Sequence, residues 1–224
     1  MHECLRRAAH YRCARIEAVW LRRLSGSVLT RTAPEGRAKE QSIMRDIFYP
    51  AFKTFLLRER ENILNRVSER NLCARVAFYL EQVKERAGLV GYHADPEYNR
   101  MQDGRIKLIL DENGQEVSIT CDLILHSRGA IVGRDNLIAI EVKKWDQPPV
   151  EKEKDRVRLR ALTKASYDEQ KWVADGGSLP EFVCGYELGV YVELDIPRSR
   201  ALIEEYERGE MAHRHVISWG ASAQ

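Results

Sequence analysis

The sequence lacks any long hydrophobic run. No stretch approaches the roughly 18 uninterrupted apolar residues that a membrane-spanning helix needs. The first residues also lack the apolar core of a secretory signal peptide, and Glu3 and Glu17 interrupt their arginines, which is not typical of an organelle transit peptide. These absences predict a soluble, cytoplasmic protein that does not bind membranes.

Cysteine is present but forms no metal-binding or disulfide pattern. The five cysteines are odd in number, and they form neither a CxxC pair nor a zinc-like spacing with histidine: Cys4, Cys13, Cys73, Cys121 and Cys184. Disulfide-stabilised extracellular domains and zinc modules are therefore not indicated. A reducing compartment fits this usage best.

The length and charge distribution indicate one domain with a basic arm. The chain has 224 residues, of which 44% are hydrophobic and 31% charged, as is usual for a globular protein. Residues 1–40 hold nine Lys or Arg and four Asp or Glu, although the whole chain has a net charge of only +2. We therefore predict an arm and linker over 1–40 and a domain over 41–224. The arm suits binding to nucleic-acid phosphates or homodimerisation through N-terminal helices, and a solvated terminus is the alternative.

The order of elements predicts an α/β fold with a central mixed sheet and a helical N-terminal extension. Residues 39–87 have a helical composition, with breaks expected near Pro50 and Ser68. The elements expected after Gly88 are strands over 106–110, 117–125 and 137–143, a charged helix over 151–174, a strand over 182–194 and a last helix over 197–208.

The helix after Ser68 carries a carboxylate near its apolar side. Leu72, Val76, Leu80 and Val83 recur at intervals of three and four residues and form a stripe. At 100° per residue, Glu69 lies within about 60° of every member of that stripe. Glu69 is therefore a candidate site residue, and the alternative is a first-turn carboxylate that favours the positive end of the helix dipole.

Two strands direct acidic and basic side chains to the face opposite their apolar residues. In the run over 117–125, Asp122 lies on the face opposite the main apolar face, and in the next strand Glu141 and Lys143 lie side by side because strands have a period of two. If the strands are neighbours with aligned apolar faces, Asp122 approaches the Glu141 and Lys143 pair. A buried strand otherwise has little reason to carry Glu and Lys on one face.

These three residue types suit phosphodiester hydrolysis. Two convergent carboxylates form a hard oxygen site for Mg²⁺, with Mn²⁺ expected to substitute. A lysine beside them can orient the attacking water and neutralise charge that develops on the phosphate. The alternative is a solvated face on which Glu141 and Lys143 pair with each other and catalyse nothing.

The sequence around these residues resembles the PD-(D/E)xK nuclease superfamily. The resemblance rests on the run Cys121-Asp122-Leu123-Ile124-Leu125-His126 and on Asn136-Leu137-Ile138-Ala139-Ile140-Glu141-Val142-Lys143-Lys144. It covers about residues 68–194, including the α-β-β-β-α-β order of the restriction-endonuclease-like core. Small bacterial members also share features like Ser68-Glu69-Arg70-Asn71-Leu72 and Glu97-Tyr98-Asn99-Arg100. Cys121 stands where the motif has proline, a position that contributes packing and no charge.

The resemblance implies an Mg²⁺-dependent nuclease. Asp122 and Glu141 would be metal ligands and Lys143 the catalytic lysine, while Glu69 would match the family's additional helix carboxylate. DNA is the expected substrate and RNA the alternative. Some members of the superfamily have lost catalysis, so a nuclease-fold module that binds nucleic acid or a protein is the second expectation.

A few further residues are candidates of lower rank. Glu97 is the rival of Glu69 as the additional carboxylate, although Asp95-Pro96 places it next to a turn. Lys154 and Arg158 in the charged helix suit phosphate binding, while the alternation of Lys and Glu there is also typical of a solvated face. His126 lies on the Asp122 face near the end of its strand, where it contacts substrate or ends the strand.

Overall fold

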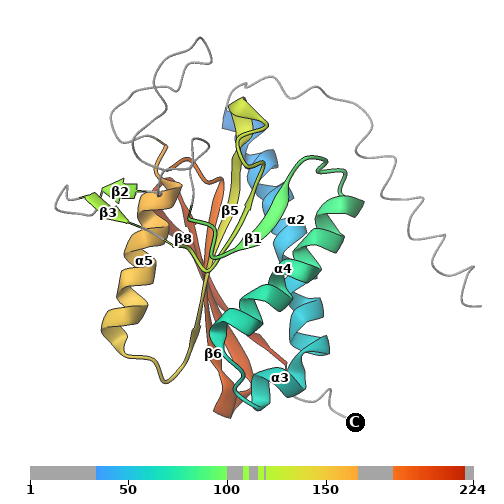
Figure 1. Ribbon diagram of the computed structural model, residues 1–224, viewed down its shortest axis with the longest axis vertical. Helices are drawn as coiled ribbons and strands as arrows, with labels where there is room; N and C mark the ends of the chain where they lie inside the picture. Colours follow the sequence, from blue (N-terminus) through green and yellow to red (C-terminus); the bar gives the residue numbers. More distant parts are fainter. Residues whose placement is uncertain (1–33, 100–107, 111–115, 119, 166–183, 220–224) are drawn as a thin grey trace, which may run out of the picture. The chain divides into compact units, whose positions relative to one another are not determined.

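A computed structural model describes residues 34–99, 108–110, 116–118, 120–165 and 184–219 (Figure 1). By its internal contacts the chain divides into two compact units, residues 1–37 and 38–224. Three predicted parts lie outside the described residues: residues 1–33 of the basic arm and linker predicted over 1–40, the start of the strand predicted from 106, and the end of the predicted helix beyond residue 165.

A six-stranded mixed sheet forms the centre of the second unit. Its strands run in the order β1, β4, β5, β6, β7, β8. Neighbours are antiparallel except β5 and β6, which are parallel. The strands span His93–Pro96 (β1), Leu123–His126 (β4), Asn136–Lys144 (β5), Leu188–Asp195 (β6), Arg200–Glu207 (β7) and Glu210–Ser218 (β8). The predicted α/β class with a mixed central sheet is therefore confirmed.

The predicted strand over 117–125 is wrong as one element. Residues Glu116–Ser118 form β3, which pairs with β2 (Leu108–Leu110) in a separate two-stranded sheet, whereas Leu123–His126 form β4 of the main sheet. An alternating pattern shows which residues share a face, but it does not show where a chain changes its pairing partner. In the main sheet, β4 pairs instead with β1, a short strand that was not predicted from the sequence.

The predicted last helix over 197–208 is also wrong. After a 3-10 turn at Ile196–Arg198, residues Arg200–Glu207 form β7, and β8 follows as a hairpin partner. Arg208 and Gly209 both have positive φ angles, of 55° and 84°, as a tight hairpin turn requires. Glu and Leu favour helices in isolation, but pairing with β6 overrides this preference.

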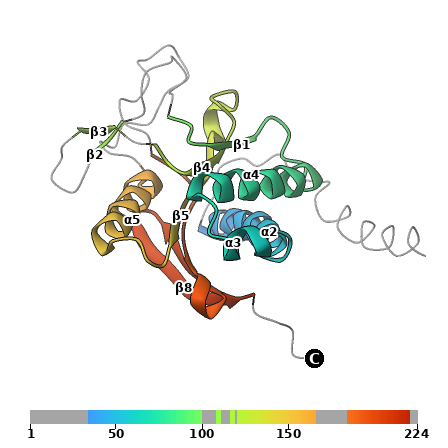
Figure 2. The same ribbon diagram turned by 60° about the horizontal axis from the view of Figure 1, so that its bottom comes forward.

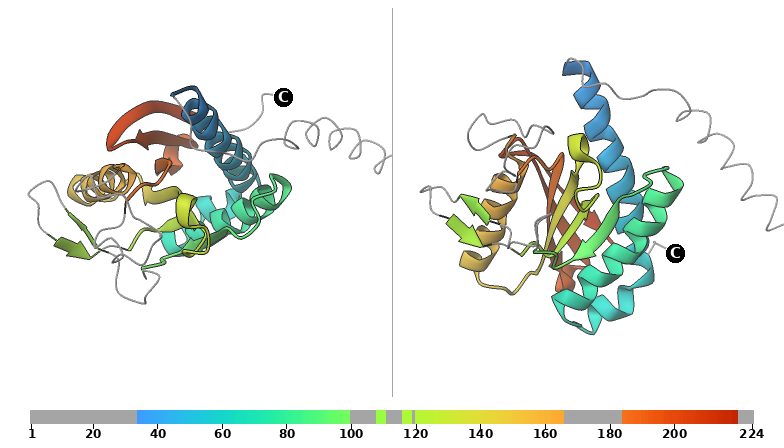
Figure 3. Two further views of the ribbon diagram at one scale, coloured as in Figure 1. Left: turned by 90° about the horizontal axis from the view of Figure 1, so that it is seen from above. Right: turned by 45° about the horizontal axis from the view of Figure 1, so that its top comes forward.

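Three helices cover one face of the sheet, and α5 covers the other (Figures 2 and 3). The three are α2 (Pro34–Arg58), α3 (Arg60–Leu64) and α4 (Glu69–Arg86), and α5 spans Pro149–Thr163. Pro50 lies inside α2 without ending it, so the break expected there does not occur. The larger core lies under α2 and α4, and its fully buried members include Phe48, Phe52 and Phe55.

The α5 face of the sheet holds a smaller core with polar neighbours. Leu159 and Leu162 of α5 pack with Tyr191 and Tyr206 of the sheet. Gly189 on β6 allows this close approach, since a Cβ there would lie 2.9 Å from Thr163 Cγ2. Glu141 and Lys143 also lie on this face, where they contact residues of α5. In the described parts of the chain, no helix has the length and apolar character needed to cross a membrane.

Candidate functional site

Strand β5 directs Glu141 and Lys143 to the α5 face of the sheet. Its alternate residues Ile138, Ile140 and Val142 belong to the larger core on the opposite face. Pairing with β6 places Glu141 beside Tyr191 and Lys143 beside Glu193. The alternation of side chains that was predicted to place Glu141 and Lys143 on one face is therefore correct for this strand.

Asp122 immediately precedes β4 and lies next to β5. The antiparallel register pairs Leu123 with Ile140, so the residue before Leu123 falls opposite Glu141. The Asp122 carboxylate accepts a hydrogen bond from the backbone N–H of Val142, with 2.9 Å between Oδ2 and N. This bond fixes one carboxylate oxygen at the start of β4. Asp122 therefore reaches the same side of the sheet as Lys143, as the sequence analysis expected.

The ammonium group of Lys143 lies among three carboxylates from three elements. Its Nζ is 3.1 Å from Asp155 Oδ2 on α5, 3.7 Å from Glu69 Oε2 on α4 and 3.9 Å from Asp122 Oδ2. Glu69 and Asp122 remain partly exposed at this point, whereas Asp155 is buried. The cluster is thus closed on its α5 side and open to solvent on the side of Glu69 and Asp122.

Glu141 is the deepest carboxylate of the cluster. Its exposed fraction is 0%, and its Oε1 lies 2.5 Å from Nη1 of Arg158. The second oxygen, Oε2, is buried without a hydrogen-bond partner among the described residues. A buried carboxylate oxygen without a partner is costly, because it has lost its hydration. This oxygen is therefore available as a ligand for a metal ion at the bottom of the cluster.

Burial and nearby charges shift the pKa values of Glu141, Asp155 and Lys143. Burial raises the pKa of Glu141 well above its usual value, the charge of Asp122 raises it further, and Arg158 opposes both. Burial likewise raises the pKa of Asp155, against the attraction of Lys143. For Lys143, burial alone would lower the pKa, but Asp122 and Asp155 outweigh it and raise the pKa. The lysine is therefore held as an ammonium ion at neutral pH.

Glu69 lies in the cluster, whereas its rival Glu97 contacts a different partner. Glu69 occupies the first turn of α4 behind Ser68, whose side chain caps the helix by accepting from the N–H of Asn71. Its Oε1 accepts a hydrogen bond from the backbone N–H of Lys144 at 3.0 Å, which ties α4 to the end of β5. Glu97 instead forms an exposed ion pair with Arg70, at 2.7 Å. The geometry thus favours Glu69 as the additional carboxylate.

The three lower-ranked substrate candidates have separate environments. Lys154 is exposed and pairs with Glu151 one turn earlier. Arg158 faces inward and binds the Glu141 and Asp155 carboxylates, at 2.5 and 3.2 Å. His126 is buried, with its Nε2 3.0 Å from Asp95 Oδ2.

Asp155 is the site residue that the sequence analysis missed. It is 3% exposed, and its carboxylate lies within ion-pair distance of both Lys143 and Arg158. A signal was present, because Asp155 precedes Leu159 and Leu162 by four and seven residues and so lies on the buried stripe of α5. An acidic residue on such a stripe requires a buried partner.

The donor chemistry of the cluster fits a hard divalent metal ion, but the side chains are arranged around cations of the protein. Carboxylate oxygens are the ligands that Mg²⁺ and Mn²⁺ prefer, and the free Oε2 of Glu141 is one of them. In the part of the chain that the structure describes, however, no three His, Cys, Asp or Glu side chains are placed to hold a metal ion together. Lys143 lies within 4.0 Å of Glu69, Asp122 and Asp155, and Arg158 binds Glu141 and Asp155, so each carboxylate of the cluster already faces a cation of the protein.

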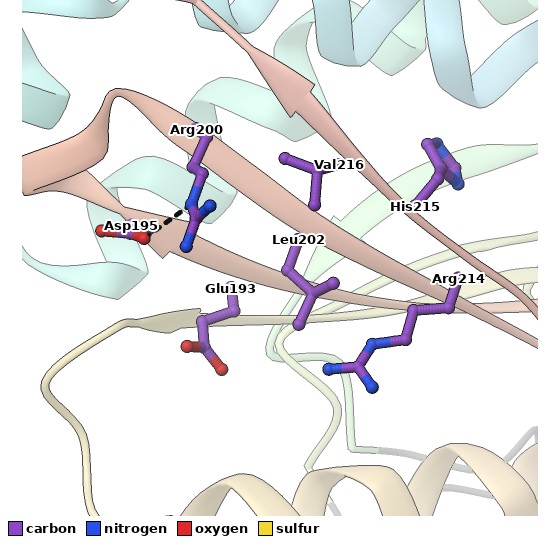
Figure 4. A pocket seen from close by; sticks show the side chains of 7 residues that line it. All are labelled: Glu193, Asp195, Arg200, Leu202, Arg214, His215 and Val216. Carbon is purple, nitrogen blue, oxygen red and sulfur yellow. Dashed lines mark hydrogen bonds and ion pairs between the residues drawn. The ribbon is translucent and has the colours of Figure 1, made fainter.

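A pocket of about 340 Å³ lies elsewhere on the sheet, over β6, β7 and β8 (Figure 4). Its charged lining includes Glu193, Asp195, Arg200 and Arg214. Arg200 is bound to Asp195 at 2.8 Å, as the dashed line in Figure 4 marks. The pocket contains no member of the carboxylate cluster, and its arginines are neutralised by protein carboxylates. We therefore place the candidate site at the cluster.

Comparisons of the chain with protein-family models, with curated proteins and with solved structures found no match.

Proposed function

We propose that this protein is a metal-dependent nuclease that hydrolyses phosphodiester bonds in DNA, with RNA as the alternative substrate. The observation that carries the proposal is the Lys143 ammonium group among Glu69, Asp122 and Asp155, next to a fully buried Glu141 whose Oε2 has no hydrogen-bond partner in the described part of the chain. A merely solvated pair of charges would not require such burial.

The order of elements supports a restriction-endonuclease-like core. The sequence α4, β1, β4, β5, α5, β6 follows the α-β-β-β-α-β order, with the β2–β3 pair as an addition between β1 and β4. In this arrangement Asp122 immediately precedes the second core strand, and Glu141 and Lys143 lie on the third. The motif resemblance and the strand order therefore both support a site at Asp122, Glu141 and Lys143.

Each residue has a distinct proposed role. Asp122, Glu141 and Glu69 would hold Mg²⁺ or Mn²⁺, which supplies Lewis-acid stabilisation of the scissile phosphate and acidifies a water molecule. Lys143 orients the attacking water and neutralises the negative charge that grows on the phosphate oxygens. Because Glu69 and Asp122 face the open side of the cluster, the phosphate approaches there.

The direct test is nuclease activity of the purified full chain. Linear, circular and single-stranded DNA and RNA would each be incubated with Mg²⁺, Mn²⁺ or a chelator, and the products separated by size. We expect cleavage of at least one substrate with either metal and none with the chelator. Lys143→Ala should reduce the rate at least about 100-fold, since it removes a group that stabilises the transition state. Lys144→Ala is the matched control, because the Lys144 ammonium group binds the Arg66 carbonyl outside the cluster.

A nuclease-fold module without catalysis is the second candidate, and one observation favours it. Arg158 and Lys143 already neutralise the carboxylates, as in a cluster that serves stability alone. Calorimetric titration separates the two candidates. A module without catalysis would bind neither Mg²⁺ nor Mn²⁺ in a way that depends on Asp122, and no substrate would be cleaved.

A further inference from the structure

The Asp155 carboxylate joins the two cations of the candidate site. Its Oδ2 lies 3.1 Å from Lys143 Nζ, and its Oδ1 lies 3.2 Å from Arg158 Nη1. Asp155 belongs to α5, whose Leu159 and Leu162 are buried against the sheet. The carboxylate is therefore carried by a packed helix and not by a loop.

Three carboxylates lie within ion-pair distance of Lys143. Its ammonium group is closest to Asp155 and farther from Glu69 and Asp122, at 3.7 and 3.9 Å. Electrostatic attraction grows as the distance between charges shortens, and a partly buried site screens it less than water does. If Asp155 lost its charge, the ammonium group would be left to Glu69 and Asp122. Those two carboxylates are the same groups that a divalent ion needs.

We propose that Asp155 is a positioning residue that holds the Lys143 ammonium group on the α5 side of the site and so keeps Asp122 and Glu69 available to a divalent metal ion. This inference rests on the proposed function and names a residue outside its motif. Asp155 acts through Lys143 and need not touch the metal ion or the substrate.

Two other roles for Asp155 make different predictions. As a direct metal ligand, Asp155 would contribute to metal affinity whether or not residue 143 is a lysine. As a purely structural partner of Arg158, it would affect stability and leave metal affinity unchanged. Only the positioning role makes the effect of Asp155 depend on the charge of Lys143.

The test is a double-mutant cycle on Mn²⁺ affinity, measured by calorimetry on the full chain without nucleic acid. Asp155→Asn should weaken Mn²⁺ binding about 10-fold, the lower end of what removal of an outer partner usually costs. In a Lys143→Met background the same change should alter affinity less than about 2-fold, and Lys143→Met alone should tighten binding. Asp146→Asn is the matched control, since Asp146 pairs with Arg66 and not with Lys143.

Any other result of the mutant cycle overturns the inference. Equal weakening of Mn²⁺ binding in both backgrounds would show that Asp155 is a direct metal ligand. No weakening in either background would show that its role is purely structural. If the wild type bound no Mn²⁺, this inference and the proposed function would fail together; an intact cycle without nucleolysis would refute the proposed function alone. Circular dichroism would check folding, and Asp155→Glu, which keeps the charge, should retain most of the affinity if the Asn variant unfolds.

Discussion

The Glu141 carboxylate and the Arg158 guanidinium group form an ion pair across the interface of β5 and α5, with 2.5 Å between Oε1 and Nη1. Arg158 satisfies one oxygen of a fully buried carboxylate and leaves the other without a partner among the described residues. The pair therefore compensates only part of the cost of burying this charge. A structural role alone would not explain why a carboxylate occupies this position.

The raised pKa of Glu141 makes the stability of the metal-free protein dependent on pH. The folded protein binds this proton more tightly than the unfolded chain, so ionisation of Glu141 weakens the folded state. The cost is absent below the ordinary pKa of 4.5 and grows as the pH rises above it. We expect Glu141→Gln to raise the free energy of unfolding at pH 7.5 by at least about 1 kcal/mol, because one pKa unit corresponds to about that energy.

Urea unfolding in the presence of a chelator, from pH 4.5 to 8, would measure this difference. The gain should shrink as the pH falls towards 4.5. Glu153→Gln is the matched control, since Glu153 is exposed on α5 and pairs with Arg160. A Glu141→Gln variant that is less stable than the wild type at every pH would show that the pair with Arg158 outweighs the cost of burial.

Contact between α5 and the sheet depends on Gly189. A Cβ at this position would lie 2.9 Å from Thr163 Cγ2, which is closer than real Cβ atoms come, and 3.2 Å from Tyr206 Cβ, which is a tight contact. Gly189→Ala should therefore destabilise the protein by about 1–3 kcal/mol, since α5 must move away. Gly133→Ala, with no atom within 4 Å of its Cβ, should stay within about 0.5 kcal/mol of the wild type. Thermal unfolding of both variants would compare them, and equal stabilities would contradict the close approach.

The α2 helix is an integral part of the larger core. Phe52 stacks between Phe48 and Phe55, with ring centroids 5.2 and 5.6 Å apart, and all three are fully buried. Phe52→Ala should cost about 3–5 kcal/mol of stability through lost packing and the cavity that remains. Leu57→Ala on the same helix removes an exposed side chain and should cost less than about 0.5 kcal/mol. Urea unfolding is the measurement, and a small loss for Phe52→Ala would mean that α2 is not needed for the core.

Local periodicity explains which parts of the fold and the site the sequence predicted. The placement of Glu141 and Lys143 follows from the alternation of β5 from Ile138 onwards, and the position of Glu69 follows from the stripe of α4. Asp155 reaches Lys143 only because α5 packs across β5, a long-range contact that no spacing records. The predicted core over about 68–194 contains neither α2 nor β7, although both contribute buried side chains.

The wrong predictions for the helix over 197–208 and the strand over 117–125 have the same physical origin. The run over 200–207 contains residues with good helix propensity, and only its pairing with β6 and β8 makes it a strand. In the run over 117–125, alternation continues across the point where the chain leaves one sheet and enters another. In both runs the strand partners decide the structure, and the local residue pattern does not reveal which strands will pair.

The choice between Glu69 and Glu97 as the additional carboxylate gives the last prediction. Glu69 Oε2 lies 3.7 Å from Lys143 Nζ, and its Oε1 is fixed by the Lys144 N–H, so it faces the open side of the cluster. Glu97 is held by Arg70 in an exposed ion pair, which contributes little to stability. Glu69→Gln should therefore weaken Mn²⁺ binding about 10-fold or more by calorimetry, whereas Glu97→Gln should leave it within about 2-fold. If the two variants exchanged these effects, Glu97 would have to leave Arg70 to bind the metal ion, and the site would lie nearer β1 than β5.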